Sequence, residues 1–232
     1  MAYSIVKQTP RIEVPHRDST LRFVHQIHEP NTYANVKQSL EQENLRTPTA
    51  SELVSLLYQV YVEDSKGKEP EFKEIKKLMD SQWLWAFTGT LFTPQGVYIQ
   101  DNPDIRGGMP YMEESNLREK LEQNDPAVRF VEPGYSTRDM SPIQLSREPY
   151  VKGLVGDEGA SKLGEIADTF KRKPKLWVLD SVTEPQTRVT ALGSDWNIGR
   201  GLVVIGYSHG NNWNGYSFGV QNSTGEASRV EK

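Results

Sequence analysis

Residues 201–225, GLVVIGYSHGNNWNGYSFGVQNSTG, contain no Asp, Glu, Lys or Arg, although 25% of the chain is charged. The stretch begins with four apolar residues, 202–205, a pattern typical of a strand buried on both faces. It continues with Gly, Tyr, Ser, His and Asn around Trp213. Tyr and Trp offer wide amphipathic area, and Ser, Gly and Asn offer adaptable hydrogen bonds, as in antibody binding loops. The sequence therefore predicts a buried strand followed by a contact loop.

The chain has 232 residues and no cysteine. Disulfides, thiolate catalysis, cysteine-ligated zinc and iron–sulfur clusters are therefore excluded. His25 and His28 form an H-x-x-H pair, but Pro30 disfavours a helix there and no third ligand is spaced nearby. We interpret both as surface histidines and expect neither a metal nor a cofactor.

The formal net charge is −4, and acidic and basic residues are interspersed. No basic stripe is present for a phosphate backbone, so we do not expect nucleic acid as the main partner. No apolar stretch approaches the roughly 18 residues of a membrane span, and the N-terminus lacks the pattern of a signal peptide. We expect a cytoplasmic protein, or one displayed by a route that the sequence does not reveal.

Two helices are the clearest local predictions. Thr49 and Glu52 have the spacing of a capping box, and apolar residues recur after them at helical spacing. A second amphipathic helix is expected over residues 71–80. Before these helices, residues 1–35 contain prolines among short β-leaning pieces such as residues 21–24, which indicates edge strands and turns.

The remaining elements are mainly strands. Residues 83–99 predict a β-meander with a turn at Pro94 to Gly96, and four strand candidates near residues 176–179, 188–192, 202–205 and 216–220 predict a C-terminal antiparallel sheet. We interpret residues 101–174 as an irregular insertion with brief helices near 113–123 and 160–170. Trp83, Trp85 and Trp177 lie inside apolar patterns and are expected to be core anchors.

Residues 206–210, GYSHG, match the G-x-S-x-G nucleophile elbow of hydrolases and follow an apolar strand. An elbow must turn into a helix, but the Asn-rich residues that follow are poor helix formers. No Asp and no further histidine follows Ser208 and His209, although hydrolases with this elbow place their acid and base after the serine. The separate segment at Arg106, Gly107 and Gly108 lacks the lysine of a phosphate loop, and we interpret it as a turn.

The C-terminal segment, residues 176–221, resembles the closing strands of C-type lectin folds of the formylglycine-generating-enzyme type. The resemblance rests on four pieces in order: Arg188-Val189, Gly193-Ser-Asp-Trp196-Asn197, Arg200-Gly201-Leu202, and Asn214-Gly-Tyr-Ser-Phe218-Gly-Val220. It implies an α+β C-type lectin fold with an antiparallel sheet, two main helices and irregular insertions, formed as a single domain by residues 1–232. Because the chain has no cysteine, the cysteine chemistry of formylglycine generation is excluded.

The same segment, with WLWAF and GVYI upstream, also resembles the variable proteins of diversity-generating retroelements, including archaeal ones. In that family, adenine-directed mutagenesis rewrites codons such as AAC in a C-terminal cassette, here residues 188–221. Replacing the two adenines yields Asn, Asp, His, Tyr, Ser, Gly and several others, but never Trp, Lys, Glu, Gln or Met. Every residue in 206–217 except Trp213 belongs to the reachable set, so Trp213 is expected to be scaffold.

This resemblance implies a non-catalytic binding protein with a diversified surface for a macromolecular ligand, which we expect to be a protein. Polar and aromatic cassette positions are expected to point to solvent and meet that ligand: Asp195, Asn197, Tyr207, His209, Asn211, Asn212, Asn214 and Tyr216. Two alternatives stay open, a hydrolase centred on Ser208 and His209 and a glycan-binding module. A calcium-dependent lectin is disfavoured because Asp195 is the only acid near the loop.

Overall fold

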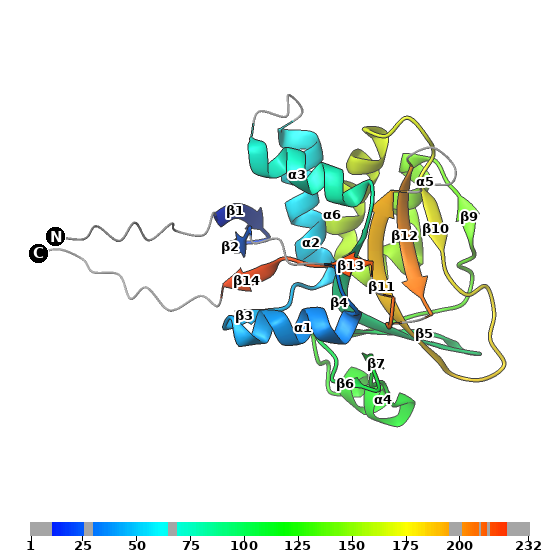
Figure 1. The fold of residues 1–232 in the computed structure, drawn as a ribbon. Coiled ribbons are helices and arrows are strands. Elements are labelled where there is room, and N and C mark those ends of the chain that lie inside the picture. The colour runs from blue at the N-terminus through cyan, green and yellow to red at the C-terminus, as the bar shows by residue number, and fades with distance from the viewer. Residues whose placement is uncertain are drawn as a thin grey trace, which may run out of the picture.

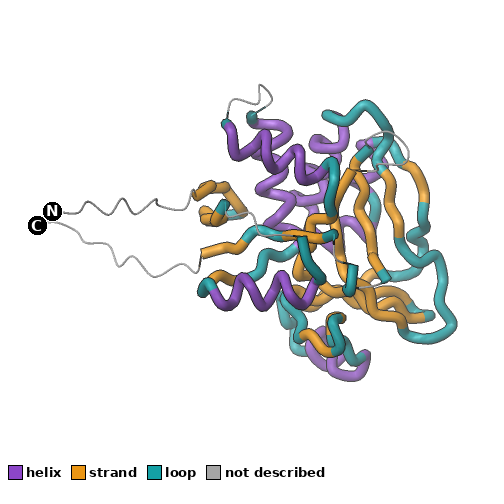
Figure 2. The backbone as a smooth tube through the Cα atoms, in the orientation of Figure 1, coloured by secondary structure: helices purple, strands orange, loops and turns teal. Residues whose placement is uncertain are grey.

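The computed structural model describes residues 11–25, 30–64, 69–194, 201–208, 210–212 and 214–221. Within these ranges the chain forms a mixed α+β fold in which helices cover a large curled sheet (Figures 1 and 2). The helices are α1 (Tyr33–Gln42), α2 (Ala50–Tyr58) with its π-helical extension η1 (Gln59–Glu63), α3 (Pro70–Met79), α4 (Glu114–Glu122), α5 (Pro142–Arg147) and α6 (Pro149–Asp168).

The large sheet has the strand order β8-β5-β4-β11-β12-β10-β9, and β13 pairs with β4 off this path. Its strands are β4 (Trp83–Thr93), β5 (Gly96–Asp101), β8 (Val128–Val131), β9 (Arg138–Asp139), β10 (Lys175–Trp177), β11 (Gln186–Ser194), β12 (Leu202–Tyr207) and β13 (Gly215–Tyr216). Most neighbours are antiparallel, but β10 runs parallel to β12 and β13 runs parallel to β4. The predicted C-terminal sheet therefore exists, but it is not purely antiparallel.

A smaller sheet joins the two ends of the described chain in the order β1-β2-β14-β3 (Figure 1). Its strands are β1 (Arg11–His16), β2 (Ser19–Val24), β3 (Leu45–Arg46) and β14 (Gly219–Gln221). The predicted N-terminal strands are thus confirmed as β1 and β2, but only β1 is an edge strand, because β2 lies between β1 and β14. The last C-terminal candidate, residues 216–220, is split between β13 in the large sheet and β14 in this small one.

Both faces of the large sheet are covered by apolar side chains. On β12, Leu202 and Val204 pack with α2, α3 and α6, whereas Val203 and Ile205 pack on the opposite face with α1. The same alternation places Leu84 of β4 on the first face and Trp85 on the second. This arrangement confirms the prediction that residues 202–205 form a strand buried on both faces.

The two predicted helices are confirmed as α2 and α3. The hydroxyl of Thr49 accepts a hydrogen bond from the backbone N–H of Glu52, and the Glu52 carboxylate accepts one from the N–H of Thr49 at 2.8 Å. This is a complete capping box. The Arg46 guanidinium also binds the Glu52 carboxylate, with N···O distances of 2.6 and 2.8 Å.

The interpretation of residues 101–174 as irregular insertion is wrong. This region contains α4, α5, α6 and β8, and α6 contributes Leu154, Leu163 and Ile166 to the same core cluster as α2. Helix α6 is interrupted at Gly156, whose φ of 78° is left-handed. The repeated glycines of α6 weaken the helical pattern in the sequence, because glycine is a poor helix former.

Two further sequence predictions need correction. Trp85 is fully buried as expected and Trp83 is partly buried, but Trp177 is 50% exposed because its side chain lies on the outer face of β10. His25 is not a surface residue: it is buried and stacks on Phe218 with ring centroids 6.0 Å apart. His28 lies outside the described residues.

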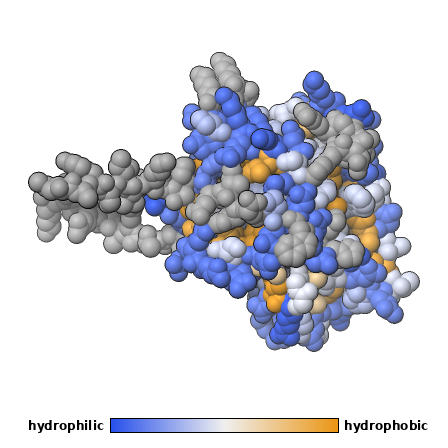
Figure 3. Space-filling view, viewed as in Figure 1, coloured by the Kyte–Doolittle hydropathy of each residue, from blue (hydrophilic) through white to orange (hydrophobic). Residues whose placement is uncertain are grey.

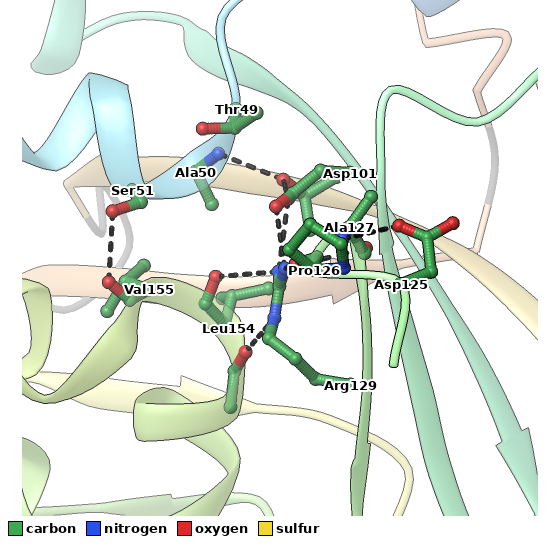
Figure 4. Close-up of polar contacts among 12 residues, drawn as sticks. Thr49, Ala50, Ser51, Asp101, Asp125, Pro126, Ala127, Arg129, Leu154 and Val155 are labelled. Carbon is green, nitrogen blue, oxygen red and sulfur yellow. Dashed lines mark hydrogen bonds and ion pairs between the residues drawn. The ribbon is translucent and has the colours of Figure 1, made fainter. Parts of the chain in front are cut away.

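A polar junction joins α2, α6, β5 and β8 (Figure 4). The Arg129 guanidinium binds the Asp101 carboxylate through two contacts of 2.6 and 3.0 Å, and its Nε donates to the carbonyl of Gly153 at 2.7 Å. The Thr88 hydroxyl donates to Asp101 at 2.7 Å and accepts from the N–H of Ala50 at 2.9 Å. These bonds fix the first turn of α2 and the part of α6 before its break at Gly156 to the sheet.

Candidate ligand-binding surface

The loop after β12 is held in its middle by backbone contacts. The N–H of Tyr33, at the start of α1, donates to the carbonyl of Gly210 at 2.8 Å. The N–H of Gly210 points at the sulfur of Met109 at 3.0 Å. A side chain at Gly210 would collide with the carbonyl of Gly108. Glycine is therefore required where the loop crosses residues 108–109.

The end of the loop is held just as closely. The N–H of Trp83 donates to the carbonyl of Asn214 at 3.0 Å, and the N–H of Asn31 donates to the carbonyl of Gly215 at 2.7 Å. A Cβ at Gly215 would overlap the Trp85 indole. Backbone groups make these bonds, so the two anchors do not depend on which side chains the loop carries between them.

The described side chains of the loop differ in exposure. Ser208 and Asn211 are exposed, whereas Asn212 and Asn214 are half-buried. Asn212 accepts a hydrogen bond from the N–H of Asn214 at 2.9 Å, and the Asn214 amide donates to the carbonyl of Ser81 at 3.2 Å. Among the predicted ligand-binding residues, Asn211 thus has the most open position, while Asn214 helps to hold the loop.

The prediction that Tyr216 points to solvent is wrong. Parallel pairing of β13 with β4 aligns Tyr216 with Leu84, and both side chains enter the core cluster that contains α2. Tyr216 is 3% exposed and packs edge-on against Phe218 with ring centroids 5.5 Å apart. Burial raises the pKa of its hydroxyl well above the ordinary value. Its oxygen has no hydrogen-bond partner among the described residues.

The other predicted positions cannot be assigned from the structure. Asp195, Asn197 and His209 lie outside the described residues, as does Trp213. The backbone of Tyr207 is described and pairs with Val189 of β11, but its side chain is not.

A hairpin beside the loop was predicted only as a turn. It consists of β6 (Ile105–Arg106) and β7 (Met109–Pro110), joined by Gly107 and Gly108 with φ of 58° and 82°. Two glycines with positive φ form the kind of turn that tight hairpins favour. The Arg106 guanidinium lies 3.6 Å from the centroid of the exposed Tyr111 ring. The Gly-Gly pair itself was the sequence signal for this hairpin.

The G-x-S-x-G match does not have the surroundings of a nucleophile elbow. Ser208 follows β12, as an elbow serine follows its strand, and it is exposed. In the described residues after Ser208, however, the next regular element is the strand β13, not a helix. This agrees with the expectation drawn from the Asn-rich sequence.

Neither a metal cluster nor a membrane-spanning helix is found within the described ranges. No three His, Asp or Glu side chains in those ranges come together in a way that could hold a metal ion. No helix there is long and apolar enough to cross a membrane.

Comparison with known proteins identifies the fold. No protein-family model and no curated protein matches the sequence. A solved structure, described as "Accommodation of massive sequence variation in Nanoarchaeota by the C-type lectin fold", is similar, with a TM-score of 0.52 and 14% sequence identity. The match covers 93% of this chain and 99% of the other. The chain therefore has the C-type lectin fold, as the C-terminal motifs predict.

Proposed function

We propose that this chain is a non-catalytic variable protein that displays a diversified C-terminal surface, residues 188–221, to a macromolecular ligand. The observation that carries the proposal is the loop after β12. Backbone bonds and two crowded glycines hold it, while Ser208 and Asn211 are exposed. A scaffold of this kind can accept changes at exposed positions because those side chains do not pack in the core.

The similar C-type lectin structure supports the same proposal, since its description concerns massive sequence variation in that fold. We extend this to the mechanism of variation. Adenine-directed mutagenesis by a diversity-generating retroelement of archaeal type would produce the residues seen in 206–217, with Trp213 as the fixed exception. We also propose that the fold is of the formylglycine-generating-enzyme kind and that residues 1–232 form a single domain.

A protein is the ligand we favour. The loop offers Ser, Asn and Gly, and the adjoining hairpin adds the exposed pair Arg106 and Tyr111. Arg and Tyr are enriched among the residues that dominate protein–protein binding energy. The retained candidates for ligand contact are Asp195, Asn197, Tyr207, His209, Asn211, Asn212 and Asn214, with Tyr216 withdrawn.

The decisive experiment is deep sequencing of the 3′ end of the gene across the source population. The neighbouring DNA is searched for a near-copy of the segment beside a reverse transcriptase. We expect substitutions confined to template adenines at positions such as Asn197, Tyr207, His209 and Asn212. The codons of Trp196 and Trp213, and all other codons of β11 and β12, are expected to stay unchanged. An invariant segment without a template copy would overturn the proposal.

A further inference from the structure

A positively charged pocket opens at the start of β12, the opposite end of this strand from the loop. It has a volume of about 230 Å³ and is lined by Asp139, Arg172, Lys173, Lys175 and residues 201–203. Three lining side chains are cationic and one is anionic, although the whole chain carries a net charge of −4. The pocket is therefore positively charged, whereas the protein as a whole is negatively charged.

The three cations are available to a ligand. Arg172 and Lys173 are exposed, Lys175 is half-buried, and within the described residues none of them lies within 4.0 Å of a carboxylate. By contrast, Arg46, Arg118, Arg129 and Arg138 each have a carboxylate partner. Cations without a carboxylate partner beside a cavity can bind an anionic group, and Asp139 is the single lining carboxylate that would compete with it.

The rim of this pocket is rigid on one side. Pro174 is buried, and its carbonyl accepts a hydrogen bond from the N–H of Met140 at 2.9 Å. Gly201 lies so close to the Lys173 carbonyl that a Cβ there would approach it to 2.6 Å. The segment that carries Arg172 and Lys173 is thus packed directly on the start of β12.

An exposed aromatic side chain adjoins the cations. Lys175 and Trp177 lie two residues apart on β10 and so share its outer face, with the Lys175 ammonium 5.3 Å from the Trp177 ring centroid. Trp177 is one of the few large hydrophobic side chains left exposed in the described chain. In the view of Figure 3, hydrophobic patches interrupt a largely hydrophilic surface. Trp is enriched among the residues that anchor a protein partner, and so is Arg, which Arg172 contributes to the same pocket.

We propose that this pocket and Trp177 bind an acidic, partly apolar polypeptide segment of the ligand. Carboxylates would pair with Arg172, Lys173 and Lys175, and an apolar side chain would pack on Trp177. A peptide fits better than a nucleic acid, because the cations that line the pocket come from one short run, residues 172–175, which is too short to follow a phosphate backbone. This inference rests on the proposed binding function and names the class of its ligand.

The positions of the pocket and the loop give them separate roles in ligand binding. Arg172, Lys173, Lys175 and Trp177 precede residue 188 and so lie outside the proposed variable segment. Ser208 lies five residues along β12 from Val203, or roughly 17 Å. An ordinary protein interface of about 800 Å² per partner spans both places. Every variant of the protein would therefore share a preference for acidic ligands, while the loop sets which acidic ligand is bound.

The test uses the full chain and a fluorescent peptide of alternating Glu and Leu. Its binding is compared with that of a Lys/Leu peptide and of single-stranded DNA. We expect the Glu/Leu peptide to bind best and added salt to weaken it. Removing two exposed cations in R172A/K173A is expected to weaken binding by about fivefold to tenfold. W177A is expected to weaken binding as well, and thermal melting confirms that each variant is folded.

The matched control is K73A/K77A, which removes the same charge from exposed lysines on α3. Equal losses in the two double variants would overturn the proposal, since only overall charge would then matter. Tighter binding of DNA, or no binding of the Glu/Leu peptide, would overturn it as well. The result is independent of the loop: an invariant gene segment would contradict the proposed function and leave peptide binding at the pocket intact.

Discussion

Arg129 and Arg172 show how differently this protein uses the same kind of side chain. Arg129 is 29% exposed, binds Asp101 through two contacts and donates to a backbone carbonyl of α6. Arg172 is exposed at the edge of a pocket and has no carboxylate partner among the described residues. A fully paired arginine stabilises the fold, whereas an unpaired arginine can bind something else. The loop shows a contrast in crowding: neighbouring atoms leave no room for a side chain at Gly210 and Gly215, whereas Ser208 and Asn211 are exposed.

The largest expected effect is a loss of stability at Tyr216, a residue of the C-terminal segment that packs in the core and is not exposed. Truncation in Tyr216→Ala leaves a cavity in the core cluster and is expected to cost about 4 kcal/mol of unfolding free energy. Tyr216→Phe, the matched control, removes only an unpaired buried hydroxyl and should be neutral or slightly stabilising. Urea unfolding of both variants measures the difference. A small loss in Tyr216→Ala would return this residue to the exposed ligand surface.

The next effect concerns the polar junction. Arg129→Ala leaves the Asp101 carboxylate, itself 22% exposed, without its charge partner, and we expect a loss of about 2 kcal/mol. Arg118→Ala is the control, because its partner Glu114 lies one helical turn away on the surface. That pair is expected to contribute less than about 0.5 kcal/mol. Similar losses in the two variants would show that the Arg129 ion pair in the polar junction contributes no more to stability than the Arg118 ion pair on α4.

A smaller effect depends on pH. Burial of Glu52 alone would raise the pKa of its carboxyl, but hydrogen bonds from Arg46 and the Thr49 N–H, together with the Arg46 charge, hold that pKa below its ordinary value. The unfolded chain therefore binds a proton at higher pH than the folded chain does. The stabilisation by Glu52 is complete above about pH 5 and is lost as pH falls through the pKa of the folded state.

Glu52→Gln is expected to lower stability by about 1 kcal/mol at neutral pH and to reduce the loss of stability between about pH 5 and pH 3. Thermal melting across this range measures both effects. Glu119→Gln, on the exposed side of α4, is the control and should leave the pH profile unchanged. A Glu52→Gln profile that falls as steeply as the parent profile would show that other carboxyls account for the acid sensitivity.

Local signals in the sequence predicted the local structure well. Thr49 and Glu52 form the capping box that their spacing indicates, and residues 202–205 form a strand buried on both faces. The C-terminal motifs predicted the C-type lectin fold that the structural comparison identifies. Each of these features depends on residues close together in the chain or on a recognisable order of short motifs.

Features that depend on distant contacts could not be predicted in this way. Tyr216 was expected to face solvent because its neighbours are Gly, Asn and Ser. Parallel pairing of β13 with β4 instead places its side chain in the core. Trp177 was expected in the core because its neighbours are apolar, but its exposure follows from the face of β10 on which it lies. The pocket brings together Asp139, Lys173 and Gly201, which no sequence spacing connects.

The central claim is that exposed side chains in the loop after β12 can be replaced without unfolding the protein. The most direct measurement is a surface-displayed pair of libraries, one randomised at Ser208 and Asn211 and the other at Gly210 and Gly215, scored by resistance to protease. We predict that most members of the first library stay folded, since exposed substitutions cost less than about 0.5 kcal/mol. Most members of the second should unfold, because their new side chains collide with Gly108 or Trp85. Equal folded fractions in the two libraries would contradict the account.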